Sequence, residues 1–89
     1  MNLIEIVTLL NTHHQRATYG AVGDVVGLPA QSVGQQLGPR NHLNSWVVNA
    51  RRGLPTGYAQ NEMHPNLLDN AQILASGEDL QAWINQHQK

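Results

Sequence analysis

The sequence predicts a mainly α-helical domain with one small β-hairpin, in the order of a winged helix-turn-helix domain. Two observations carry this prediction: two short helical segments meet at a turn near Gly27, and an apolar run after them is broken by Arg51-Arg52-Gly53. The chain has 89 residues, enough for one modest hydrophobic core. We therefore expect residues 1–89 to form a single domain.

Capping residues place the first and last helices. A capping box that starts at Asn2 predicts an N-terminal helix over residues 2–11. Near the other end, Pro65 opens an apolar segment and Ser76 is suited to cap a further helix. The C-terminal part is therefore expected to be helical over residues 65–86.

The two helices in the middle are bounded by capping, proline and glycine residues. Thr18 is a good N-cap for a helix that stops at Gly27. Pro29 suits the first turn of the next helix, which Gly38 closes. Residues 18–38 are therefore expected to form a helix-turn-helix.

The predicted hairpin covers residues 45–58 and would be the wing of the domain. Residues 46–48 are strand formers, residues 51–53 read as a turn, and residues 54–58 can return antiparallel. Two arginines at such a tip contact DNA phosphates in many winged domains, whereas on other proteins they are simply solvated.

Composition limits the functions open to this chain. Charged residues make up only 12%, and the formal net charge is −1, which does not favour a polyanion partner. The charge is unevenly spread, because Arg40, Arg51 and Arg52 are close in sequence while most acidic residues follow them. The middle of the chain is therefore locally basic.

Several kinds of chemistry lack their usual residues. There is no cysteine, the five histidines do not show zinc-ligand spacing, and no G-x-S-x-G elbow is present. No apolar run is long enough for a membrane span, and the N-terminal segment lacks the features of a signal peptide. We expect no cofactor, no metal and no membrane partner, and a cytoplasmic location.

Four stretches together resemble a known family. They are TYGAVGDVVGLP, SVGQQLG, VVNARRGLP and a later segment with a Leu-Leu pair, and they extend from about Thr18 to Gly77. They resemble the DNA-binding domain of alkylguanine-DNA alkyltransferases and, more closely, the non-enzymatic alkyltransferase-like proteins. The resemblance implies binding of duplex DNA, with the second helix of the pair in the minor groove, and recognition of DNA damage in DNA repair. A DNA-binding role would place the protein at the nucleoid.

The resemblance also implies that alkyl transfer is lost. The family's Pro-Cys-His-Arg motif aligns with Leu43-Asn44-Ser45-Trp46, so Asn44 replaces the nucleophile, Ser45 the His and Trp46 the Arg. The supporting Glu aligns with Ser76. A carboxamide cannot accept an alkyl group as a thiolate does. We therefore expect no enzyme, and a degenerate base pocket at residues 44–46.

The DNA-contacting positions of the family are retained unevenly. Tyr19 matches a Tyr that presses on the backbone of the flipped nucleotide, and Gly34 matches a Gly that allows close approach to the groove. Gln31 replaces the Arg that fills the place of the extruded base. The complete set of expected DNA contacts is Tyr19, Gln31, Ser32, Gly34, Gln35, Arg40, Arg51 and Arg52.

Two alternatives stay open from the sequence. Trp46 can be a core residue, or it can take the place of the pocket Trp that alkyltransferase-like proteins carry. The domain can bind DNA, weakly or with help from a partner, and sense alkylated or otherwise modified guanine. Otherwise it is a regulatory module that has lost DNA binding and contacts a protein through its acidic C-terminal helices.

Overall fold

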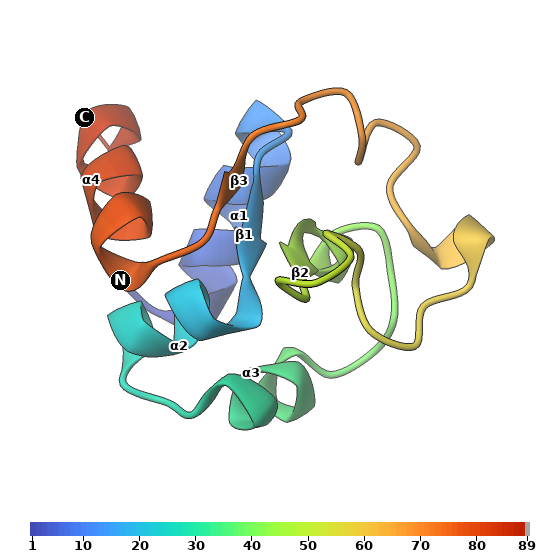
Figure 1. The fold of residues 1–89 in the computed structure, drawn as a ribbon, viewed down its shortest axis with the longest axis horizontal. Coiled ribbons are helices and arrows are strands. Elements are labelled where there is room, and N and C mark those ends of the chain that lie inside the picture. The colour runs from blue at the N-terminus through green and yellow to red at the C-terminus, as the bar shows by residue number, and fades with distance from the viewer. Residues whose placement is uncertain (89) are drawn as a thin grey trace.

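Three short parallel strands form the centre of the fold. The structure, a computed structural model, describes residues 1–88, so Lys89 of the predicted domain lies outside the described residues. Strand β1 (Arg16–Thr18) lies between β2 (Val47–Val48) and β3 (Ile73–Leu74). Both outer strands run parallel to β1, with Ala17 opposite Val47 on one side and Leu74 on the other. Figure 1 shows α1 behind this sheet and α4 to one side of it.

Four α-helices accompany the sheet. They are α1 (Leu3–His13), α2 (Tyr19–Val26), α3 (Ala30–Leu37) and α4 (Gly77–His87), with single 3₁₀ turns η1 (Asn44–Trp46) and η2 (Gln60–Glu62). The predicted caps are present: Asn2 forms a capping box with Glu5, and Thr18 caps α2. In residues 1–88, no helix is long and apolar enough to cross a membrane.

The prediction of a winged helix-turn-helix fold is wrong. The helices α2 and α3 lie close to their predicted bounds and pack together, but the strands that accompany them form a parallel sheet. The segment between α1 and α2, for which no strand was expected, contains β1, the central strand of that sheet. The described chain is therefore an α/β fold with four helices and a three-stranded parallel sheet.

The predicted hairpin over residues 45–58 does not form. The chain does reverse after β2, where the Asn49 N–H donates to the Leu54 carbonyl at 3.0 Å. The pairing goes no further, since the next N–H, that of Thr56, donates to the Tyr19 hydroxyl at 3.0 Å and not to β2. Both residues of β2 are fully buried and pair with β1 instead, as strands of parallel sheets commonly do.

The predicted helix that begins at Pro65 is also absent, so residues 65–86 are not helical throughout. Residues 65–69 form turns, and the chain then enters β3 before α4 begins at Gly77. Asn66 donates its side-chain amide to Asp69 at 2.7 Å, a local bond typical of turns. Short polar side chains in this segment therefore favour turns over a helix, despite its helical spacing of leucines.

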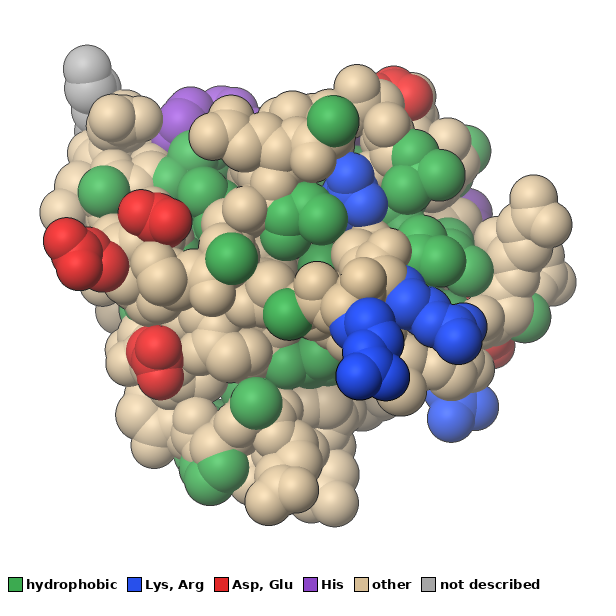
Figure 2. Space-filling model, viewed as in Figure 1, with side chains coloured by type: hydrophobic (Ala, Val, Ile, Leu, Met, Phe, Trp, Pro, Cys, Tyr) green, Lys and Arg blue, Asp and Glu red, His purple; other side chains and the backbone are tan. Residues whose placement is uncertain are grey.

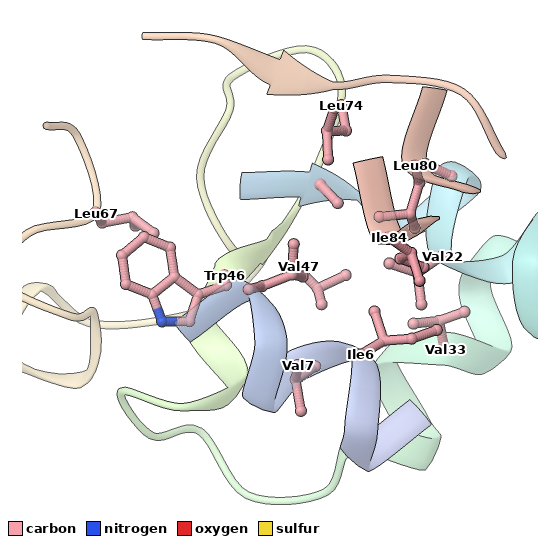
Figure 3. Close-up of a cluster of buried hydrophobic side chains, with 13 residues drawn as sticks. Ile6, Val7, Val22, Val33, Trp46, Val47, Leu67, Leu74, Leu80 and Ile84 are labelled. Atoms are coloured by element: carbon pink, nitrogen blue, oxygen red, sulfur yellow. The ribbon is translucent and has the colours of Figure 1, made fainter. Parts of the chain in front are cut away.

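One hydrophobic core joins the helices to the sheet. Its members come from all four helices, from η1, from the three strands and from the turn that carries Leu67. Figure 3 shows Trp46 at the same end of this cluster as Leu67, with Leu80 and Ile84 of α4 at the other end. The irregular segment between β2 and β3 covers the side of the molecule opposite α4 (Figure 1). That segment forms part of the candidate site.

Candidate nucleic-acid interface

A groove with a volume of about 780 Å³ lies beside α3. We call it the Tyr19 groove. It is lined by the start of α2, by one face of α3 with the residues that follow it, and by the segment between β2 and η2. The lining residues are Tyr19, Ala30, Gln31, Gly34, Gln35, Leu37, Gly38, Pro39, Arg40, Thr56, Tyr58 and Glu62.

Most of the residues that were expected from the sequence to contact DNA line this groove. Those that line it are Tyr19, Gln31, Gly34, Gln35 and Arg40. Ser32 is half-buried on α3 and is not among the lining residues. Arg51 and Arg52 are exposed in the loop that leads to the Thr56 wall of the groove.

Tyr19 connects two walls of the groove. It is the first residue of α2, where the Thr18 hydroxyl caps the helix by accepting the Ala21 N–H at 3.0 Å. The Tyr19 hydroxyl accepts the backbone N–H of Thr56 at 3.0 Å. Its ring also borders Gly34, because a Cβ at Gly34 would lie 3.8 Å from Tyr19 Cε1, an ordinary contact distance. Gly34 therefore adds no side chain to the groove, although the packing would tolerate a Cβ at this position.

Tyr58 and Glu62 also line the groove, although neither was predicted from the sequence to contact DNA. Burial raises the pKa of Tyr58, and the nearby Tyr19 and Glu62 raise it further. The Tyr58 hydroxyl therefore stays protonated at neutral pH and can donate a hydrogen bond. The sequence offered one signal for Tyr58, because aromatic residues make up only 4% of the chain and Tyr58 is one of its two tyrosines.

Arg40 lines the groove and packs against Gly57. An added Cβ at Gly57 would come within 3.2 Å of Arg40 Nη2. Arg40 itself is exposed, whereas Glu62, which also lines the groove, is half-buried and accepts the Ala59 N–H at 2.7 Å. The lining of the groove therefore includes one exposed cation and one half-buried carboxylate.

Arg51 and Arg52 sit on a compact loop, which we call the arginine loop and define as residues 49–54. The side chain of Asn49 forms hydrogen bonds with the backbone of this loop. Its side-chain oxygen accepts the Arg52 N–H at 2.6 Å, and its side-chain amide donates to the Leu54 carbonyl at 2.8 Å. The backbone of this loop is thus ordered while both arginine side chains are exposed.

The basic side chains gather on one part of the surface. In Figure 2 the blue Lys and Arg groups lie in the centre and right of the view, whereas the red Asp and Glu groups lie mainly along the left edge. The basic and acidic residues, which are unevenly distributed along the sequence, are therefore also unevenly distributed over this face of the molecule.

The three residues expected at a degenerate base pocket face inward and do not line the groove. Asn44 donates its side-chain amide to the carbonyls of Leu37 and Pro39, at 3.0 and 2.9 Å. The Ser45 hydroxyl donates to the His42 carbonyl at 2.7 Å and accepts the His64 N–H at 3.0 Å. The Asn44 amide N–H groups and the Ser45 hydroxyl are therefore used to hold the chain after α3 in place.

Trp46 is fully buried in the core. Its indole N–H donates to the Asn11 side chain at 2.8 Å, and its ring stacks on His14 with an interplanar angle of 7°. Its ring also lies 4.8 Å from that of His64, measured between centroids. In this structure Trp46 is a core residue and does not line the Tyr19 groove.

The histidines pack mostly against the two tryptophans and against each other. His13 and His87 contact Trp83, and His64 lies between His14 and His42. Within residues 1–88, no group of three or more His, Cys, Asp or Glu side chains is arranged to hold a metal ion.

Comparisons with protein-family models, with curated proteins and with solved structures give no significant match.

Proposed function

We propose that this protein binds duplex DNA, without acting as an enzyme, through the Tyr19 groove and the arginine loop. The observation that carries the proposal is that most of the expected DNA contacts come together in one groove. Residues from α2, from α3 and from the segment after β2 line this groove. The protein would then work at the nucleoid, in the cytoplasm.

Phosphates are the first contacts in this proposal. Arg40, Arg51 and Arg52 are all exposed and close to the groove or its adjoining loop. Arginine binds phosphate oxygens through several N–H groups at once and positions a protein on the duplex. The exposed amides of Gln31 and Gln35 on α3 can then donate to and accept from base edges.

We further propose that binding does not extrude a base. The side chains at the expected base pocket are buried, and each forms a hydrogen bond inside the protein. Gln31 is also shorter than the Arg that the resemblance would require to replace the extruded base. Duplexes with and without an alkylated guanine should therefore bind with the same affinity.

Fluorescence anisotropy with a labelled duplex at low salt tests this function. Arg40→Ala should weaken binding, and Gln31→Ala combined with Gln35→Ala should weaken it further. Gln86→Ala removes an exposed glutamine from α4, away from the groove, and should leave binding unchanged. Equal and negligible binding by every variant and by the wild type would contradict the proposal, and preference for an alkylguanine duplex would contradict the absence of base extrusion.

A protein partner is the second candidate function, favoured by a different surface. Leu68 is 66% exposed and lines an apolar groove of about 490 Å³ with Leu54, Met63 and Leu67. Leu68→Ser tests this candidate. Weaker DNA binding by this variant, with the fold intact, would show that the apolar groove belongs to the DNA interface and would remove the support for a separate partner.

A further inference from the structure

Arg16 is a buried cation beneath the arginine loop. It lies on the central strand β1 and is only 6% exposed. Both of its hydrogen bonds go to neutral backbone carbonyls: Nη1 donates to Gly53 at 2.8 Å and Nη2 to Asn70 at 2.9 Å. Its Nε is buried and has no hydrogen-bond partner among residues 1–88. Arginine at such depth is normally paired with an acid.

The bond to Gly53 connects Arg16 directly to the loop that carries the exposed arginines. Gly53 follows Arg52 and has a φ of +68°, in the left-handed region that glycine adopts without strain. An added Cβ at Gly53 would lie 3.0 Å from Arg16 Nη1 and 2.8 Å from Ile73 Cδ1. The loop backbone therefore rests closely on the guanidinium and on β3.

The same guanidinium holds the other side of the sheet. Asn70, whose backbone carbonyl accepts from Arg16, comes just before β3. Its side-chain amide donates to the side-chain oxygen of Gln15 at 3.0 Å. Gln15 in turn donates to the Gln72 backbone carbonyl at 2.9 Å. Arg16 thus bridges the arginine loop and the segment before β3. Gln15 also bonds to the segment before β3, whereas of these two residues only Arg16 bonds to the arginine loop.

Stability alone gives a weak reason for a charge at this position. Burial lowers the pKa of the guanidinium, which shows the desolvation that the cation suffers. A buried charged group is often replaced by an apolar side chain of similar size without loss of stability. What an apolar side chain cannot do is donate to the Gly53 and Asn70 carbonyls together.

We propose that Arg16 is a positioning residue, which fixes the arginine loop in the conformation that presents Arg51 and Arg52 to phosphate. This inference rests on the proposed DNA binding for its purpose, but its structural part concerns the loop itself. A positioned loop binds without ordering its backbone first, and each backbone residue left free costs a factor of roughly 5 to 30 in affinity.

Arg16→Met is the main variant, because methionine is unbranched and apolar and fits irregular spaces. Two measurements apply to it: amide hydrogen exchange at Asn49 and Gly53, whose N–H groups bond within the loop, and anisotropy titration of duplex DNA over several salt concentrations. We expect protection at Gly53 to fall roughly tenfold and DNA affinity to fall at least fivefold, with an unchanged salt slope, since no phosphate contact is removed.

Arg52→Ala is the matched control. It should reduce the salt slope by about 0.9 because one phosphate contact is lost, while Gly53 keeps its protection. Unchanged protection at Gly53 in a folded Arg16→Met protein would overturn the inference. So would lost protection combined with unchanged affinity of a protein that does bind DNA.

The outcome also separates this inference from the function on which it rests. If the wild type does not bind DNA, the proposed function fails, whereas lost protection in Arg16→Met would still support positioning of the loop. If Arg16→Met does not fold, Arg16→Lys decides, because lysine keeps the charge but lacks the fork that reaches both carbonyls. Protection at Gly53 below that of the wild type would support the inference, and protection equal to it would overturn it.

Discussion

The Tyr19 hydroxyl accepts a hydrogen bond from the backbone N–H of Thr56, with a distance of 3.0 Å between the two atoms. This bond joins the first residue of α2 to the segment that follows the arginine loop. Both residues line the Tyr19 groove, so the bond fixes the width of the groove at one point. A ring without the hydroxyl would keep the packing and lose this connection.

Tyr19→Phe should therefore loosen the groove with a small effect on stability. The bond is exposed, and we expect its loss to lower the free energy of unfolding by about 0.5–1 kcal/mol. Hydrogen exchange should become faster at Thr56 but not at Leu67, whose N–H donates to the His64 carbonyl. Unchanged exchange at Thr56 would show that the hydroxyl does not hold this wall.

The bond between Trp46 and Asn11 predicts a larger effect. Asn11→Ala would leave the indole N–H of a fully buried tryptophan without its acceptor, which costs about 1–3 kcal/mol. Denaturant unfolding measures this difference. Asn85→Ala is the control, since Asn85 is exposed and its substitution should change stability by less than about 0.5 kcal/mol. Equal stability of both variants would contradict this account of Trp46.

Two glycines of α2 should respond to alanine in opposite directions. A Cβ at Gly23 would collide with the Leu28 carbonyl oxygen, where the chain turns from α2 towards α3. We expect Gly23→Ala to destabilise the protein by about 2 kcal/mol or more, as overpacking does. A Cβ at Gly20 would lie 3.9 Å from Thr18 Oγ1, an ordinary contact distance, and Gly20→Ala should be neutral or stabilising by up to about 1 kcal/mol, because alanine favours a helix. Thermal unfolding of the pair measures both effects.

His64 should make the stability of the protein depend on pH. Burial lowers the pKa of His64, and the neighbouring His14 and His42 lower it further, although Asp69 opposes them. In its neutral form His64 Nδ1 accepts the Asn66 N–H at 3.0 Å, and protonation removes this acceptor. The unfolded chain then binds the proton more readily than the folded one. This stability is therefore complete above about pH 6.5 and is lost as the pH falls below that value.

Thermal unfolding between pH 7.5 and 5 measures this dependence. His64→Asn is the matched variant, because an Asn side chain accepts the N–H two residues later and does not titrate. The variant should lose less stability than the wild type on acidification. A parallel loss in both proteins would assign the pH dependence to other groups.

The helices could be predicted from the sequence because their signals are local. Asn2, Thr18 and Ser76 each cap the helix expected to follow them, and Gly27 ends α2 in the left-handed conformation. Each of these signals depends on residues within one or two turns. The bounds of α2 and α3 could therefore be placed without knowledge of the fold around them.

The pairing of the strands could not be predicted in this way because their partners are distant in the sequence, although Val47 and Val48 were expected to form a strand. Ala17 pairs with Val47 and with Leu74, and no strand within residues 1–88 is longer than three residues. So short a strand has no periodicity to detect. Gln15, just before β1, and Arg16, its first residue, also make this strand hard to recognise. Polar residues are expected outside a core, but these two are buried.

The candidate site was predicted in part for the same reasons. Tyr19, Gln31 and Gly34 lie on helices whose positions were known, and the groove contains them. Tyr58 and Glu62 reach the groove only because the expected hairpin does not form and the chain takes another course after the arginine loop. The inward direction of Asn44 depends on contacts with the end of α3, which no sequence pattern reveals.

The salt dependence of DNA binding tests the central claim most directly. With about three phosphates contacted by Arg40, Arg51 and Arg52, the logarithmic slope of affinity against salt should be about −2.7, so affinity should fall roughly 40-fold between 50 and 200 mM salt. Arg51→Ala with Arg52→Ala should reduce the slope to about −0.9, and the same salt change should then weaken binding only about 3- to 4-fold. Binding with the same slope in the wild type and the double variant, or no binding at the lower salt concentration, would contradict the claim that this surface holds DNA.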